Sequence, residues 1–164
     1  MKMIDGADPV AEVTGEGVLV VTKGLALAAQ DEAAVAGALA YAIVLDAVAR
    51  GGPISSDLVG IVSKALALPG LDEDMVRRLD GLPGGESGDP LRTAMSIAAN
   101  AGYDPAGWLD FEADRPLRPG ESEVSRTERV ARLGELASSV QREFPGATLR
   151  NRRVWQVAKR GLVG

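Results

Sequence analysis

One long apolar segment constrains the fold of this chain more than any other feature. From Ala33 to Val48 the residues are apolar almost without interruption, and Asp46 carries the only charge. Asp31 precedes the segment and Arg50 follows it. A negative charge is favourable at the positive N-terminal end of a helix dipole, and a positive charge at its negative C-terminal end. An apolar helix without a polar face is stable when it is covered on all sides. The sequence therefore predicts a helix over residues 31–50 at the centre of a globular domain.

The same segment does not predict a membrane span. It is shorter than the roughly 20 apolar residues that a spanning helix needs, and it contains Asp46. The first residues of the chain are acidic and show no apolar signal sequence. The chain contains no cysteine, which excludes disulfides, thiolate metal ligands and cysteine nucleophiles. We therefore expect a cytoplasmic protein without a membrane span.

The remaining elements place the chain in the α+β class, with helices predominating. Residues 10–21 are rich in β-branched and apolar side chains around Gly15-Glu16-Gly17, which predicts a small N-terminal antiparallel sheet or hairpin. Further helices are predicted over about residues 58–68, 72–80, 91–101, 123–144 and 151–160, and from residue 104 onward. Residues 81–90 contain four glycines and two prolines and predict a mobile loop. Because aromatic residues make up 4%, the core must consist of Ala, Val, Leu and Ile, which favours closely packed helices.

Charge divides the chain into an acidic body and a basic tail. Residues 142–164 hold six basic side chains against Glu143 alone, a balance of +5, whereas residues 1–141 hold 12 basic and 22 acidic ones, a balance of −10. We expect a domain over residues 1–146 and a basic helical tail over residues 147–164. Val154, Val157 and Ala158 form an apolar stripe, with Trp155 beside it, that would dock on the domain or on a partner. Binding of the tail to nucleic acid or to an acidic membrane face is a weaker interpretation. The six basic side chains are accompanied by a single aromatic residue, Trp155, which is a thin signal for such binding.

Four segments of the chain resemble a known family. They are Gly17-Val-Leu-Val-Val-Thr-Lys-Gly-Leu25, Asp31-Glu-Ala-Ala-Val-Ala-Gly-Ala-Leu-Ala40, Ala101-Gly-Tyr-Asp-Pro105 and Arg126-Thr-Glu-Arg-Val-Ala-Arg-Leu133. In this order and spacing they are similar to the HtpX-like and CaaX-prenyl-endopeptidase-like zinc metallopeptidases. The resemblance spans residues 8–136 and implies a compact, gluzincin-like domain.

The residues at the expected zinc site depart from the family pattern. Where the family has H-E-x-x-H, this chain has Tyr41-Ala42-Ile43-Val44-Leu45, and the whole sequence contains no histidine. Two histidines one helical turn apart hold the zinc ion, and the glutamate between them activates its water. The family's other ligand positions fall on Gly51, near Glu86 and Ser87, and on Glu123. The resemblance therefore implies a degenerate site without zinc or another cofactor, which Tyr41 and Leu45 fill with apolar volume.

Other interpretations of single side chains stay open. Tyr41 could be a surviving acid or hydrogen-bond donor, although no second catalytic group lies beside it at helical spacing. Glu86, Asp89 and Glu123 could converge on a hard cation, although solvated loop and cap residues are far commoner. A serine nucleophile would lack a histidine or an obvious lysine base.

The sequence thus predicts a pseudoenzyme, a catalytically inactive metallopeptidase-like protein that acts as a scaffold or interaction subunit. Its partner would be another protein or a second copy of the chain, and we do not expect nucleic acid. In the family, the strand before the active-site helix lies at a sheet edge and receives an extended peptide. The resemblance places Val18, Leu19, Val20, Val21 and Thr22, or their hairpin partner, at this edge. The alternatives are a peptide-binding module that uses the residual cleft and a hydrolase with an unrecognised non-zinc site.

Overall fold

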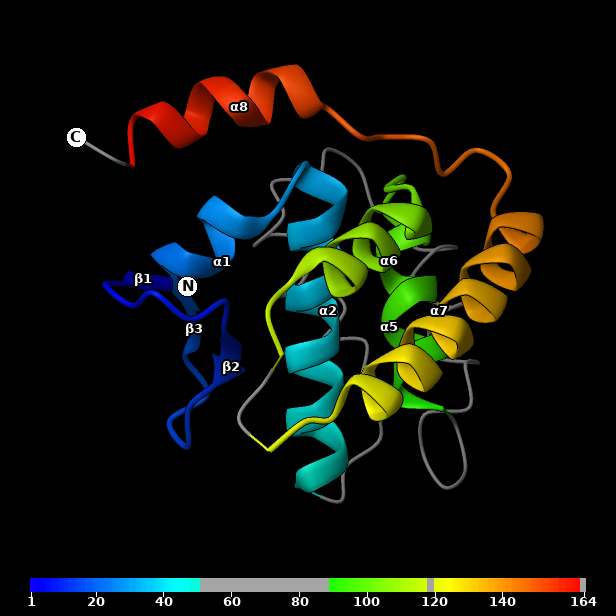
Figure 1. The fold of residues 1–164 in the computed structure, drawn as a ribbon, viewed down its shortest axis with the longest axis horizontal. Coiled ribbons are helices and arrows are strands. Elements are labelled where there is room, and N and C mark those ends of the chain that lie inside the picture. The colour runs from blue at the N-terminus through cyan, green and yellow to red at the C-terminus, as the bar shows by residue number, and fades with distance from the viewer. Residues whose placement is uncertain (51–88, 118–119, 163–164) are drawn as a thin grey trace.

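The computed structural model describes residues 1–50, 89–117 and 120–162 (Figure 1). The strands in these ranges are β1 (Lys2–Ile4), β2 (Ala11–Val13) and β3 (Leu19–Thr22). The helices are α1 (Lys23–Ala28), α2 (Glu32–Ala49), α5 (Pro90–Asn100), α6 (Pro105–Asp114), α7 (Glu123–Glu143) and α8 (Arg152–Arg160). The prediction of a mostly helical α+β fold with a small N-terminal sheet is confirmed. The helices predicted over residues 58–68 and 72–80 and nearly all of the predicted loop over residues 81–90 lie outside the described residues.

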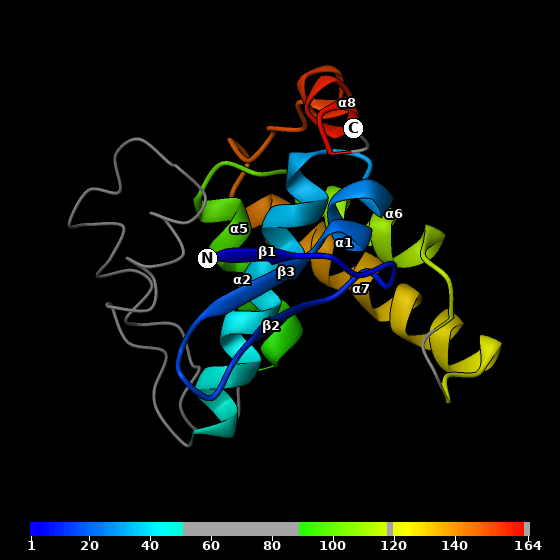
Figure 2. The same ribbon diagram turned by 90° about the vertical axis from the view of Figure 1, so that its left-hand side faces the viewer.

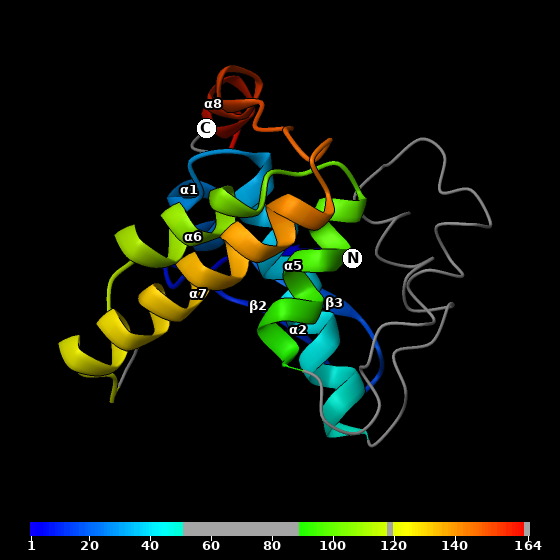
Figure 3. The ribbon, with the colours of Figure 1, turned by 90° about the vertical axis from the view of Figure 1, so that its right-hand side faces the viewer.

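Helix α2 is the centre of the fold, as its sequence predicts. On one side it packs against β2, and on the other it packs against α5 and α6, which α7 covers in turn (Figures 1 and 3). Small residues allow the close approach of α2 and α6. A Cβ atom on Gly37 would lie 2.5 Å from Trp108 Cβ, and one on Gly107 would lie 2.5 Å from Ala33 Cβ. The predicted close packing of helices is therefore seen at this contact.

Short local signals start the helices where the sequence predicts them. The Asp31 side chain caps α2 by accepting from the Ala34 N–H at 3.0 Å. Asp104 caps α6, and Pro105 is the first residue of that helix, a position where proline costs no hydrogen bond. The same pair occurs at α5, where Asp89 is the cap and Pro90 the first residue. The predicted loop over residues 81–90 was therefore one residue too long at its end, since Pro90 is the first residue of α5.

The sheet differs from a simple hairpin. Strands β2 and β3 pair antiparallel as predicted, but β1 pairs parallel with the other side of β3, so the sheet is mixed with the order β1-β3-β2 (Figure 2). The placement of residues 18–22 at a sheet edge is therefore wrong for β3, which is the central strand. The physical reason is that residues 2–4 supply the backbone partners on its second side. The hairpin partner β2 lies at an edge.

Helix α2 is long and apolar enough to cross a membrane by length and composition alone. More than half of it, 56%, is buried inside the domain, which is how a core helix of a soluble fold also looks. It is the one helix of this kind within the described ranges, so the fold is compatible with the expectation of no membrane span.

The basic tail forms helix α8, which lies along the outside of the domain (Figure 1). It docks through Trp155 and Lys159, which share one face because they are one turn apart. The Trp155 indole N–H donates to the carbonyl of Ala29 at 3.1 Å, and Lys159 Nζ donates to the carbonyls of Leu27 and Ala29 at 2.9 and 2.8 Å. These carbonyls lie at the C-terminal end of α1, where a helix leaves acceptors unpaired. Burial at this contact lowers the pKa of Lys159.

The apolar stripe of Val154, Val157 and Ala158 does not face the domain, and its docking on a partner stays a prediction. Val154 is 59% exposed and Val157 62% exposed, because the carbonyls of α1 attract the polar tips on the opposite face of the helix. Two basic residues next to the domain form ion pairs with it: Arg150 binds Asp31 at 2.7 Å and Asp110 at 2.6 Å, and Arg152 lies 3.5 and 3.4 Å from the same carboxylates. Arg153 and Arg160 form no ion pair with any described residue.

Candidate functional site

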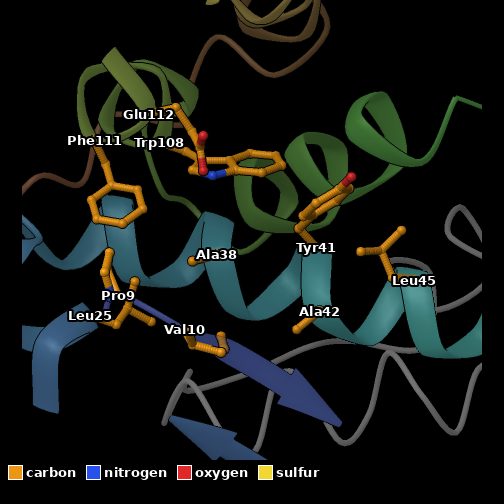
Figure 4. A pocket seen from close by; sticks show the side chains of 11 residues that line it. Pro9, Val10, Leu25, Ala38, Tyr41, Ala42, Leu45, Trp108, Phe111 and Glu112 are labelled. Atoms are coloured by element: carbon orange, nitrogen blue, oxygen red, sulfur yellow. The ribbon is translucent and has the colours of Figure 1, made fainter. Parts of the chain in front are cut away.

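An open pocket lies beside the part of α2 where the metallopeptidase pattern would place its zinc ligands. Tyr41, Ala42 and Leu45 line it (Figure 4), and its volume is about 260 Å³. Ala42 is 6% exposed at its wall, whereas Leu45 is 42% exposed at its rim. The expectation that Tyr41 and Leu45 fill the site is therefore wrong. They border a cavity that is still accessible.

The position of Tyr41 explains why the cavity is not filled. Its ring leans onto the indole of Trp108 from α6, with ring centroids 5.2 Å apart and planes inclined at 44° (Figure 4). A tilted pair of this kind is a favourable arrangement for two aromatic rings. The interaction with Trp108 therefore holds Tyr41 at one wall.

The wall of the pocket opposite Tyr41 is the segment that leads into strand β2. Pro9, Val10 and Ala11 line the pocket there, across from α2. Thr22 anchors this segment, since its hydroxyl donates to the carbonyl of Asp8 at 2.6 Å and accepts from the N–H of Val10 at 3.0 Å. The same hydroxyl caps α1. One threonine thus ties the pocket wall to the helix that leads into α2.

A buried carboxylate lies at the α6 side of the pocket. Glu112 is bound by Arg115 at 2.8 Å and Arg129 at 3.2 Å, and both arginines also bind Glu121. Burial alone would lower the pKa of Arg115, but its hydrogen bonds to Glu121 and Glu112 outweigh that effect and raise the pKa. Both guanidinium groups thus bind Glu112, and its carboxylate is part of an ion-pair network.

The other predicted site residues do not converge on this pocket. Glu123 is the exposed first residue of α7, and Asp89 is taken up as a helix cap and as the partner of Arg132 at 2.7 Å. Glu86 and Gly51 lie outside the described residues. Within the described ranges, no three side chains of the types Asp, Glu, His or Cys lie close enough together to hold a metal ion. The described residues at the pocket therefore do not fit a zinc ion of the kind that the family's H-E-x-x-H pattern holds.

The strand predicted to receive a peptide is likewise not at the pocket. Leu19, Val20, Val21 and Thr22 are buried in the central strand, and Val18 is exposed just before it. The pocket is formed instead by residues that the sequence did not predict, chiefly Val10, Trp108 and Glu112. The spacing of Glu112 and Arg115 at i and i+3 on a helix was a readable signal of an ion pair. Nothing in the local sequence shows that Val10 faces α2.

The fold and the pocket define a mostly helical α+β domain with an open apolar cavity between its central helix and its sheet edge. No family model, curated protein or solved structure matches the chain. The resemblance to zinc metallopeptidases therefore depends on the four sequence segments alone.

Proposed function

We propose that the chain is a non-catalytic, metallopeptidase-like interaction protein that binds an extended segment of a partner protein at the pocket beside Tyr41. The observation that carries this proposal is an open apolar cavity bordered by an edge strand. The partner is a different protein or a second copy of the chain, in a reducing cytoplasmic compartment as the absence of cysteine indicates.

The side chains at the pocket support binding rather than catalysis. Tyr41, Ala42 and Leu45 replace the groups that would bind a metal and activate water, and no histidine exists anywhere in the chain to serve as a base. The nearest carboxylate, Glu112, is neutralised by Arg115 and Arg129. An apolar cavity of about 260 Å³ is large enough for one aliphatic side chain of a ligand.

The edge of β2 supplies the second element of a peptide site. In an antiparallel pair, alternate residues direct their backbone groups toward the partner strand and away from it. The N–H of Thr22 donates to the carbonyl of Val10, and the N–H of Thr14 donates to the carbonyl of Val18, so the even-numbered residues bond β3. The backbone groups of Ala11 and Val13 therefore point to the outer edge. An extended segment could pair there and place a side chain in the cavity next to Ala11.

Fluorescence polarisation with labelled peptides tests this proposal. The probe is a hexapeptide of serine and threonine with one central leucine, and its control carries aspartate in place of that leucine. We expect saturable binding of the leucine peptide alone, and about tenfold weaker binding to Leu45→Glu, which puts a charge at the rim. Leu117→Glu is the matched control variant, since Leu117 is 40% exposed and lies outside the pocket.

Two results would contradict the proposal. Equal binding of both peptides, or a Leu45→Glu affinity equal to that of Leu117→Glu, would show that the cavity is not the site. Cleavage of casein by the purified wild-type chain, abolished in Tyr41→Phe, would favour the alternative of a hydrolase with an unrecognised site.

A further inference from the structure

A second pocket lies on another side of α2, beneath the docked tail. Its volume is about 310 Å³, and Met3, Val35 and Leu39 form much of its apolar lining. It shares no described lining residue with the pocket at Tyr41. The volume falls at the lower end of the range, about 300–1,000 Å³, that is usual for small-molecule sites.

Two polar groups meet in this otherwise apolar pocket. The Glu32 carboxylate, in the first turn of α2, accepts from Asn151 Nδ2 at 3.0 Å. The buried Tyr103 has no hydrogen-bond partner for its hydroxyl among the described residues. Burial and, second, the negative charge of Glu32 raise the pKa of Tyr103, and both residues line this pocket. The described lining of the pocket therefore includes one carboxylate and one phenol hydroxyl, and the first residue of the chain, Met1, lies at its border.

The tail supplies an aromatic ring at the same pocket. Trp155 lines it, and the hydrogen bond from its indole N–H to the carbonyl of Ala29 fixes the orientation of the ring. Aromatic faces attract cations, and a tryptophan is the strongest side chain in this respect. A carboxylate and two aromatic rings around an aliphatic wall have the chemistry that recognises an organic ammonium group.

We propose that this pocket binds a small organic cation, namely an alkylammonium compound with a short aliphatic body. The ammonium group lies between the Glu32 carboxylate and the rings of Tyr103 and Trp155, and the aliphatic body lies against Val35 and Leu39. An anion of the same size would meet the charge of Glu32, and a neutral analogue would gain nothing from it. The site is independent of the peptide pocket at Leu45.

Calorimetric titration of the full chain with hexyltrimethylammonium tests the proposal, with hexanol and hexanoate as the neutral and anionic comparisons. We expect binding of the cation, at least about tenfold weaker binding of hexanol, and none of hexanoate. Glu32→Gln should weaken the cation about tenfold and leave hexanol unchanged. Glu12→Gln is the charge-matched control, because Glu12 is an exposed residue of β2 outside the pocket.

A second readout locates the ligand. The indole N–H resonance of Trp155, identified by its loss in Trp155→Phe, should shift on addition of the cation. Val35→Phe keeps Glu32 and fills the cavity, so it should abolish both the heat and the shift. The proposal is overturned if the cation gives no heat at millimolar concentration, if Glu32→Gln binds like Glu12→Gln, or if Val35→Phe still binds.

Discussion

Helices α2 and α6 approach each other closely where Gly37 contacts Trp108, which lines the pocket at Tyr41. We predict that Gly37→Ala destabilises the protein. A Cβ atom at position 37 would lie 2.5 Å from Trp108 Cβ, 2.6 Å from Cγ and 3.0 Å from Cδ2. The nearest atoms belong to the root of the tryptophan side chain, so a change of rotamer at its far end cannot relieve the overlap. Helix α6 itself would have to move away from α2.

Two opposing terms set the size of the effect. Alanine is the better helix former by about 1 kcal/mol. Overpacking of a close-packed core costs about 1–3 kcal/mol, and the upper end applies here because backbone must shift. We therefore expect a net loss of about 1–2 kcal/mol in the free energy of unfolding. The leucine peptide should also bind more weakly, since Trp108 and Tyr41 together form one wall of its pocket.

Urea unfolding at constant temperature, followed by circular dichroism, measures this prediction. Gly134→Ala is the matched control, because Gly134 also lies inside a helix but a Cβ there would be 3.9 Å from its nearest neighbour, Leu109 Cδ2. It should stabilise the protein by about 0.5–1 kcal/mol. Equal stabilisation by Gly37→Ala and Gly134→Ala would refute the reasoning, since it would mean that α2 and α6 are not in close contact.

Three further predictions concern the metal, the tail and pH. The dialysed protein should contain no stoichiometric zinc by elemental analysis, and the triple variant Tyr41→His, Ala42→Glu, Leu45→His should not cleave casein, since no described third ligand is in place. Truncation after Pro145 should lower the melting temperature by roughly 4–8 °C, because loss of the Trp155 contact alone removes about 2 kcal/mol of stability. If the melting temperature does not change, and the full chain binds duplex DNA with a steep salt dependence, the tail is instead a free nucleic-acid arm. Because the pKa of Tyr103 is raised in the folded state, the unfolded state loses the proton of the Tyr103 hydroxyl first, near pH 10.0. The contribution of Tyr103 to the free energy of unfolding should therefore be fully present below that pH, and should be lost as pH rises through the pKa of the folded state. In Tyr103→Phe, the midpoint of urea unfolding should decline less as the pH is raised above about 10 than it does in the wild-type protein.

The features that the sequence predicted well depend on neighbours in the chain. The pairs Asp89-Pro90 and Asp104-Pro105 start α5 and α6 because a short acidic side chain satisfies the first N–H groups and proline needs none. The buried α2 follows from its own composition, since an apolar helix has to be covered. In each case the signal itself lies within the element or directly before it, even where the covering partners of α2 are distant in the sequence.

The features that were missed depend on pairing across long stretches of sequence. The parallel register of Met3 with Val21 makes β3 a central strand, and nothing in either segment specifies that contact. The docking face of α8 was likewise decided by the carbonyl groups of Leu27 and Ala29, more than 100 residues earlier in the chain. An apolar stripe indicates which face of a helix can be buried. It does not show whether a polar contact on the opposite face is stronger.

The open pocket results from the way Tyr41, Ala42 and Leu45 differ in size and position. Ala42 is too small to fill the space, Leu45 lies at the rim, and Tyr41 is held at one wall by Trp108, whose own place depends on Gly37. Burial of apolar surface stabilises a protein by about 25 cal/mol for each Å² removed from solvent, and the exposed wall of the pocket lacks this stabilisation. That cost falls on the free chain and is relieved when an apolar side chain of a partner enters the cavity. The geometry at Tyr41 and Leu45 therefore favours a surface that binds a partner over a closed, fully packed core.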